Sequence, residues 1–172
     1  MPKIKRISFF RAVSPLSQTI ADSTHQIPEI AFIVTRLELD NGITGDGHLL
    51  AFHYSREAIL GALRDAAPMA LGMEVSDTGR FLAKHEKESE YFGNVGLHRW
   101  AAGSINTAMW DAWAKTLRAP IWKLFGTCHD RVPLYGSGGW LSYSMEELLD
   151  EVRRYVKRGF RSVKVKVGSP EI

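Results

Sequence analysis

The amino-acid sequence predicts two regions of different fold class, an α+β domain followed by the start of a parallel α/β array. Residues 30–39 are apolar and β-branched, and Asp40-Asn41-Gly42 after them is typical of a hairpin turn. A long helical pattern covers residues 97–117. After about residue 127 the order becomes strand, helix, strand, which implies a parallel pair of strands.

The composition is that of an ordinary globular protein. Of the 172 residues, 45% are hydrophobic and 24% are charged, and 22 basic against 19 acidic residues give a net charge of +3. This balance is too mild to predict nucleic-acid binding by itself. A single cysteine excludes an intrachain disulfide, and the N-terminus carries no apolar run typical of a signal peptide. We predict a soluble, cytoplasmic protein with no membrane partner, because no segment approaches the roughly 20 apolar residues of a span.

The N-terminal half predicts an antiparallel three-stranded meander followed by helices. Strands are expected over residues 4–13, 30–39 and 43–50, and the polar stretch 14–28 reads as a loop because it has neither a helical nor a strand period. Helical patterns then follow, the first with Ser55 as its N-cap. These helices are expected over residues 55–67, 77–87, 97–117 and 121–125.

The C-terminal part predicts one βαβ unit. A short strand is expected at 132–135 and a loop at 136–139. A helix over 144–158 should begin with a capping box, because Glu147 follows Ser144 at the required spacing. A second strand is expected at 161–167. We therefore place the domain boundary between residues 1–127 and 128–172.

The last strand carries two lysines where a buried strand should be apolar. Residues two apart in a strand share a face, so Lys164 and Lys166 lie on one side and the valines between them on the other. An edge strand with solvated lysines is one interpretation. The other places both lysines inside a barrel, near the strand ends where active sites gather.

Charge repulsion gives the second interpretation a chemical meaning. Two ammonium groups about 6–7 Å apart repel by roughly 2–3 kcal/mol at an effective dielectric constant near 20. That energy corresponds to a pKa lowered by about two units. A lysine of this kind can serve as a general base near neutral pH, while its partner keeps the positive charge that stabilises a developing oxyanion.

Four segments together resemble the mandelate racemase and muconate-lactonizing branch of the enolase superfamily. They are TRLELDNGITGDGH (35–48), INTAMWDAWAKTLRAPIWKLFG (105–126), VPLYGSGG (132–139) and GFRSVKVKVG (159–168). The resemblance implies an α+β capping domain followed by a TIM-like (β/α)7β barrel. It also implies a Mg²⁺ ion on the substrate carboxylate and a base that removes the proton α to it, giving an enediolate. In this sequence Lys166 would be that base, and Lys164 would contact the carboxylate and lower the pKa of Lys166.

Within this branch the chain looks most like the acid-sugar dehydratases. Residues 15–28 resemble their substrate loop, in which Asp22, Thr24 and His25 would hydrogen-bond a polyhydroxylated substrate. A plain solvated connection is the alternative for this loop. A second loop near residues 48–54 would present Tyr54, together with Phe52 and His53, to the substrate.

The sequence departs from the family at the metal site. The family's three acidic ligands lie on the third to fifth barrel strands, and no acidic trio with the needed spacing occurs among the 172 residues. We therefore expect a truncated barrel, the N-terminal part of a longer Mg²⁺ enzyme of the acid-sugar dehydratase or racemase/epimerase type, and no activity from this part alone. The full-length enzyme would act on a small carboxylate and form a homo-oligomer.

Two interpretations of another class remain. The chain could be a non-catalytic capping or binding module, or a partner subunit that lacks the metal site. Basic residues near the C-terminus could indicate nucleic-acid binding, but they divide between a helix surface and a strand, and the helix also carries acidic residues. We predict no nucleic-acid partner.

Overall fold

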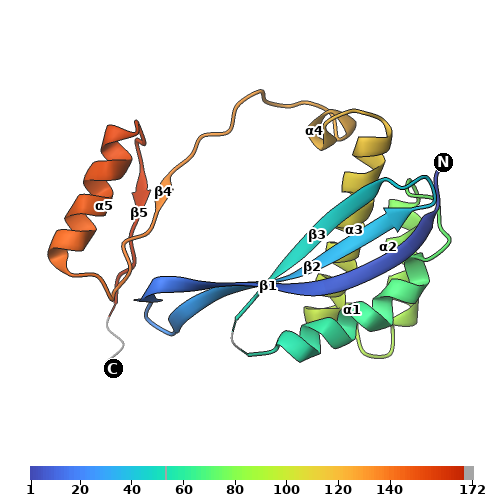
Figure 1. The fold of residues 1–172 in the computed structure, drawn as a ribbon, viewed down its shortest axis with the longest axis horizontal. Helices are drawn as coiled ribbons and strands as arrows, with labels where there is room; N and C mark the ends of the chain where they lie inside the picture. Colours follow the sequence, from blue (N-terminus) through green and yellow to red (C-terminus); the bar gives the residue numbers. More distant parts are fainter. Residues whose placement is uncertain (53, 169–172) are drawn as a thin grey trace. The chain divides into compact units, whose positions relative to one another are not determined.

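The computed structural model describes residues 1–52 and 54–168 and divides the chain into two compact units (Figure 1). Unit 1 consists of Met1–Val13 and Ala31–Thr127. Unit 2 consists of Ser14–Ile30 and Cys128–Ile172. The chain therefore passes between the units at residues 13–14, at 30–31 and at 127–128, and only the last of these is the predicted boundary. The assignment of residues 1–127 and 128–172 to two domains stays a prediction.

The sheet of unit 1 is the predicted antiparallel meander. Its strands lie in the order β1 (Ile4–Ala21), β2 (Gln26–Leu39) and β3 (Thr44–Ala51). The turn between β2 and β3 closes through Gly42, whose backbone has a φ of 84° and whose N–H donates to the Leu39 carbonyl oxygen. The Asn41 side chain accepts the Ile43 N–H, so the sequence Asp-Asn-Gly forms the hairpin that it predicts.

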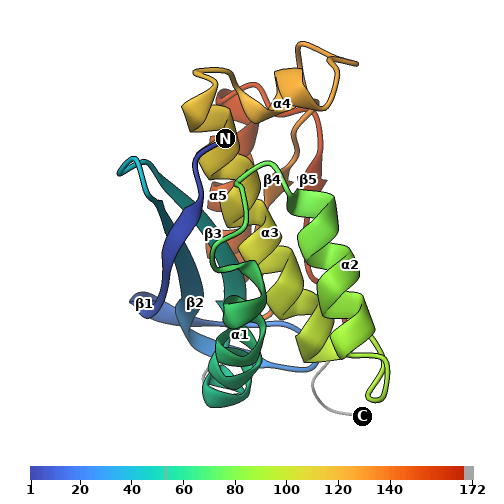
Figure 2. The same cartoon turned by 90° about the vertical axis from the view of Figure 1, so that its right-hand side faces the viewer.

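Helices α1, α2 and α3 lie on one side of this sheet (Figure 2). The helices of unit 1 are α1 (Arg56–Ala70), α2 (Thr78–Glu88), α3 (Gly96–Thr116) and the single turn α4 (Ile121–Leu124). All four correspond to predicted helices. Ser55 does occupy the N-cap position of α1, but its side chain makes no capping hydrogen bond and its φ is 62°.

The core of unit 1 lies between the sheet and α3. Every second residue of β2 from Ala31 to Leu39 is buried, which is the two-residue period of a strand with one covered face. On α3 the side chains of Ala101, Ile105, Ala108 and Ala112 are all buried in this core.

Two glycines of β3 allow α3 to lie against the strand. A Cβ atom at Gly45 would stand 2.6 Å from the Ala112 backbone nitrogen, and one at Gly47 would overlap the Ser104 carbonyl oxygen. The helix offers small residues at the same places. Beside them the Ser104 hydroxyl is hydrogen-bonded to Thr35 at 2.8 Å, so both buried hydroxyls are satisfied.

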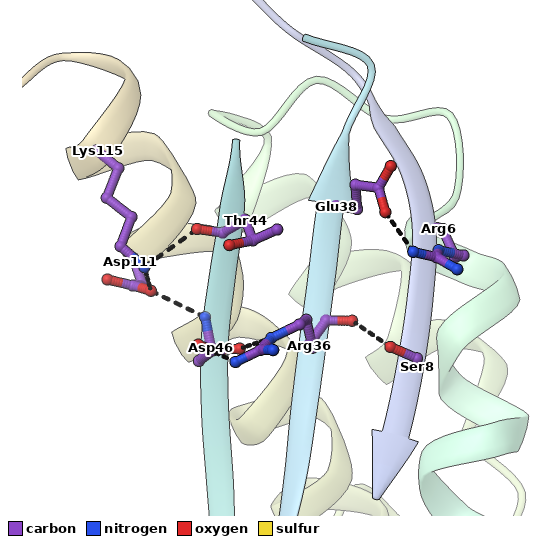
Figure 3. Close-up of polar contacts among 8 residues, drawn as sticks. All are labelled: Arg6, Ser8, Arg36, Glu38, Thr44, Asp46, Asp111 and Lys115. Carbon is purple, nitrogen blue, oxygen red and sulfur yellow. Dashed lines mark hydrogen bonds and ion pairs between the residues drawn. The ribbon is translucent and has the colours of Figure 1, made fainter. Parts of the chain in front are cut away.

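Polar contacts tie the same helix to the exposed edge of the sheet (Figure 3). The Asp111 carboxylate accepts the Asp46 backbone N–H at 2.8 Å and the Lys115 ammonium at 2.5 Å. Lys115 also donates to the Thr44 carbonyl oxygen, and Arg36 binds the Asp46 carboxylate through two nitrogens. We call Asp111, Lys115, Thr44 and Asp46 the Asp111 brace.

Unit 2 contains the outer part of the β1–β2 hairpin and one βαβ unit. Strand β4 (Gly136–Ser137) pairs in parallel with β5 (Val163–Lys164), and α5 (Met145–Lys157) connects them. The capping box at Ser144 and Glu147 is present with both hydrogen bonds, and Gly159 follows the helix with a φ of 86°. The predicted parallel pair and capping box are therefore confirmed.

Three sequence-based expectations about strands were wrong. The stretch 14–28 is not a loop, because β1 continues to Ala21 and β2 begins at Gln26. These strand ends are mostly exposed, so no buried face imposes a period on their sequence. The first strand of the βαβ unit is not at 132–135 but at Gly136–Ser137, where the Gly136 N–H donates to the Ser162 carbonyl oxygen. The second strand is shorter than 161–167, although one ladder bond continues to Lys166.

Candidate functional site

The two predicted lysines stand beside aromatic rings at the end of β5. The Lys164 Nζ lies 5.9 Å from the centre of the Tyr135 ring, and the Lys166 Nζ lies 4.6 Å from that of Trp140. Both rings are within the range of a cation–π contact. Lys164 is exposed, whereas Lys166 is partly buried. The structure therefore distinguishes the two lysines by their environment.

The surroundings of Lys166 lower its pKa below the ordinary lysine value. Partial burial is the largest cause, the neighbouring Lys164 ammonium is the next, and the Asp22 carboxylate acts in the opposite direction. The direction is the one expected from two lysines on one face. The leading cause is burial, which disfavours the charged form, rather than charge repulsion.

The turn of the β1–β2 hairpin contains three predicted substrate residues in a hydrogen-bonded loop. One carboxylate oxygen of Asp22 accepts the backbone N–H groups of Thr24 (2.9 Å) and His25 (2.8 Å) and the Thr24 hydroxyl (3.0 Å). These bonds, the one from the Thr24 backbone first, lower the pKa of Asp22. The Thr24 hydroxyl also lies 2.7 Å from the His25 Nδ1. The turn thus presents a carboxylate, a hydroxyl and an imidazole in a fixed arrangement.

This turn lies against the βαβ unit within unit 2. The Leu141 backbone N–H donates to the Ala21 carbonyl oxygen at 2.9 Å. A Cβ atom placed on Gly168 would lie 3.5 Å from the Ser23 Cβ. Together with the effect of Asp22 on the Lys166 pKa, these contacts bring the hairpin turn and the lysine strand to one place.

Tyr54 belongs to unit 1, so its grouping with the other predicted substrate residues stays a prediction. Its ring is half-exposed and stacks on Phe52, with centroids 5.7 Å apart. His53, named with it from the sequence, lies outside the described residues.

Sequence reasoning missed two residues that the structure places at this site. Trp140 was not connected with Lys166, although a residue just past one parallel strand faces the end of its neighbour. Glu151 was counted only among the acidic residues of the last helix, but its carboxylate accepts the Gly139 backbone N–H at 2.7 Å. The sequence indicated this contact only through the position of Glu151 on the helix that connects the two parallel strands.

Neither a metal-binding cluster nor a membrane-spanning helix is found in the part of the chain that the structure describes. Among residues 1–52 and 54–168 no three His, Cys, Asp or Glu side chains are placed to hold a metal ion together. None of the helices in these ranges combines the length and apolar character needed to cross a bilayer.

Comparison with known proteins identifies the family. Residues 7–126 match the model of the mandelate racemase / muconate lactonizing enzyme N-terminal domain. The chain belongs to this family. The match covers the sheet and helices of unit 1 and the β1–β2 hairpin. The resemblance seen in the sequence is therefore confirmed.

Two curated relatives of this chain have names that contain a sugar acid. The 3,6-anhydro-alpha-L-galactonate cycloisomerase of Streptomyces coelicolor is 29% identical over 160 residues, covering 92% of this chain and 44% of the relative. The arabinonate dehydratase of Saccharolobus solfataricus is 31% identical over 139 residues, covering 80% of this chain and 37% of the relative. The chain spans less than half the length of these relatives.

A solved structure extends the likeness over both units. The L-talarate/galactarate dehydratase of Salmonella typhimurium LT2, liganded with Mg and L-lyxarohydroxamate, matches with a TM-score of 0.89 and 25% identity. The match covers 99% of this chain and 45% of that protein. The predicted fold class, a capping domain of sheet and helices followed by the start of a barrel, is thereby confirmed.

Proposed function

We propose that this chain supplies the base-carrying part of an enzyme that removes the proton α to the carboxylate of an acid sugar. The observation that carries the proposal is the pair Lys164 and Lys166, with Lys166 partly buried and its pKa lowered. A neutral amine and a neighbouring ammonium are what proton removal from such a carbon needs.

The two lysines have different roles in this step. The lone pair of the neutral Lys166 amine takes the α-proton, and the electrons of the C–H bond move toward the substrate carboxylate to give an enediolate. The exposed Lys164 ammonium lies beside this group and stabilises the added negative charge. Partial burial of Lys166 supports this division, because it raises the share of neutral amine near pH 7.

Mg²⁺ is expected for the whole enzyme, because the Salmonella relative was solved with Mg. The metal supplies charge stabilisation to a carboxylate when it is bound. The residues described here contain no set of three carboxylates, imidazoles or thiols that fits it. The proposed step therefore uses only Lys166 and Lys164 of this chain, and we propose that the chain alone is inactive.

The hairpin turn supports an acid sugar as the substrate. Asp22, Thr24 and His25 offer hydrogen-bond donors and acceptors beside the lysine strand, which suits a chain of hydroxyl groups. The relatives named above are a galactonate-type cycloisomerase, an arabinonate dehydratase and a talarate/galactarate dehydratase. Galactarate is therefore the first substrate to test.

The test follows exchange of the α-proton of galactarate in deuterated water by ¹H NMR. The 172-residue chain alone should show no exchange. Residues 1–168, fused in place of the matching part of the Salmonella dehydratase, should restore exchange, and Lys166→Ala in the fusion should abolish it. Lys157→Ala, on the exposed side of α5, is the matched control and should retain exchange.

Three results would contradict the proposal. Exchange by the chain alone would show that it is a complete catalyst. Full exchange in the Lys166→Ala fusion, with an unchanged circular dichroism spectrum, would show that another group takes the proton. A folded fusion without exchange would instead favour the non-catalytic module.

A further inference from the structure

The segment 138–141 connects three parts of unit 2 at the proposed base. The Gly138 N–H donates to the Lys164 carbonyl oxygen, and the Lys166 N–H donates to the Gly139 carbonyl oxygen at 2.8 Å. The Leu141 N–H donates to the Ala21 carbonyl oxygen of the hairpin. The position of this segment therefore sets both the lysine strand and the turn that carries Asp22.

Helix α5 holds this segment through one side chain. Glu151 accepts the Gly139 N–H through its Oε2 at 2.7 Å. Gly139 has a φ of 57°, and a Cβ atom there would stand 2.6 Å from a methyl carbon of Val165, so only glycine fits between the carboxylate and the strand. The two hydrogen bonds of Gly139 thus join Glu151 to the backbone of Lys166.

The next residue carries the ring that faces the lysine ammonium. Trp140 follows Gly139 directly, and its ring lies 4.6 Å from the Lys166 Nζ. A shift of the Gly139 peptide would move this ring and the Lys166 backbone together. Within residues 1–52 and 54–168, no other residue of α5 forms a hydrogen bond with segment 138–141.

We propose that Glu151 is a positioning residue for Lys166, acting through the Gly139 peptide and the Trp140 ring; this role rests on the proposed function of Lys166 as the base. Glu151 does not touch the substrate in this role. It fixes the amine and the ring that partly covers it. Partial burial is also the largest cause of the lowered Lys166 pKa, which agrees with a role for this cover.

The experiment uses NMR of the isotope-labelled 172-residue chain, with the lysine ε-methylene signals assigned through Lys164→Ala and Lys166→Ala. The Trp140 ring should move the Lys166 ε-protons upfield in the unaltered chain. Glu151→Ala should abolish this upfield shift, raise the Lys166 pKa toward its ordinary value and speed the exchange of the Gly139 amide. Glu151→Gln keeps an oxygen acceptor and should preserve all three signals.

A second variant disturbs the contact between Glu151 and Gly139 without changing Glu151. A Cβ atom at Gly138 would stand 2.5 Å from the Glu151 Oε1, so Gly138→Ala displaces the carboxylate without removing it. This variant should reproduce the loss seen with Glu151→Ala, and it decides the question if Glu151→Ala does not fold. Glu146→Ala, an exposed glutamate on the same helix, should change nothing.

Three outcomes would overturn the proposal. The first is an unchanged upfield shift of the Lys166 ε-protons in Gly138→Ala or Glu151→Ala. The second is a loss of this shift in Glu151→Gln as large as in Glu151→Ala. The third is a change in the Lys164 signal as large as that of Lys166, because Tyr135 should keep the Lys164 signal in place. The last outcome would mean that unit 2 as a whole depends on Glu151. None of these measurements involves turnover, so they are independent of the exchange assay that tests Lys166 as the base.

Discussion

Unit 1 and unit 2 are each stabilised internally by a different kind of interaction. Unit 1 contains a continuous cluster of buried apolar side chains between its sheet and α1–α3. Among the described residues of unit 2, Ile27 is the only hydrophobic side chain that is buried. Helix α5 has no buried residue, and Val156 and Val167 are 62% and 80% exposed.

Unit 2 is organised by hydrogen bonds instead. They are the capping box of α5, the bond from Glu151 to Gly139, the Tyr155 hydroxyl on the Ser137 carbonyl oxygen and the ladder between β4 and β5. Each such bond contributes about 0.5–1.5 kcal/mol, whereas a fully buried large apolar side chain contributes about 1.5–3 kcal/mol. The comparison teaches that packing stabilises unit 1, while directional bonds set the geometry of the candidate site.

The largest expected effect is a cavity in unit 1. Ile105→Ala removes a side chain with no exposed surface and should lower the free energy of unfolding by about 2–5 kcal/mol. Val165→Ala in unit 2, at 42% exposure, should cost less than about 1 kcal/mol. Urea unfolding followed by far-ultraviolet circular dichroism measures both. Equal costs would show that the two units do not differ in how they are stabilised.

The next effect is expected at the Asp111 brace, which is the polar part of unit 1. Asp111→Ala leaves the Asp46 N–H without its acceptor and leaves the Lys115 ammonium with the Thr44 carbonyl oxygen alone, so it should cost about 1–3 kcal/mol. The control is Asp150→Ala, which removes an exposed ion pair with Arg153 and should cost at most about 1 kcal/mol. If Asp111→Ala lowers the free energy of unfolding no more than the control does, the Asp111 brace contributes no more than an exposed ion pair.

A smaller effect is expected at the start of α5. Ser144→Ala removes the acceptor of the Glu147 N–H and should cost about 0.5–2 kcal/mol of helix stability. Amide exchange of Glu147 should become faster, while the amides of α3 keep their protection. Ser144→Asp, which restores an acceptor, should recover the slow exchange. Faster exchange in α3 as well would mean that the units are not independent in stability.

The smallest effect at neutral pH is expected at His85, which is buried in unit 1 with no hydrogen-bond partner at Nδ1 among the described atoms. Burial first, and then His98, lowers the pKa of His85 below its ordinary value of 6.5. The unfolded chain therefore binds the proton more readily, so stability is complete above about pH 6.5 and falls as the pH drops through the folded pKa.

Unfolding measured between pH 7.5 and 5 checks this sign. His85→Gln should flatten the decline, because the titrating group is gone. His129→Gln, which alters an exposed histidine, should leave the decline unchanged. If stability still declines with falling pH in His85→Gln, other titrating groups cause the decline.

Local signals in the sequence predicted much of the fold. The hairpin at Asn41-Gly42, the capping box of Ser144 and the long helix α3 each depend on residues close in the chain. The outer hairpin was missed because its strands are solvated on their faces, so they carry no alternation. The place of β4 was missed because Gly136 joins the ladder through its backbone alone, which leaves no side-chain pattern.

The candidate site could be predicted only in part for a similar reason. The spacing of Lys164 and Lys166 is visible in the sequence, and so are the polar residues of the hairpin turn. The contacts of Trp140 and Glu151 depend on how α5 and the two strands come together. The close approach of α3 that requires Gly45 is likewise a tertiary property.

The β1–β2 hairpin limits how recombination between genes can exchange parts of this chain. Each of its two strands begins in one unit and ends in the other, because residues 14–30 belong with unit 2 and the flanking segments with unit 1. No single recombination point can exchange one unit between genes while leaving the other whole. A crossover near residue 127 would combine the turn of one parent with the lysine strand of another, and so would separate the two halves of the candidate site.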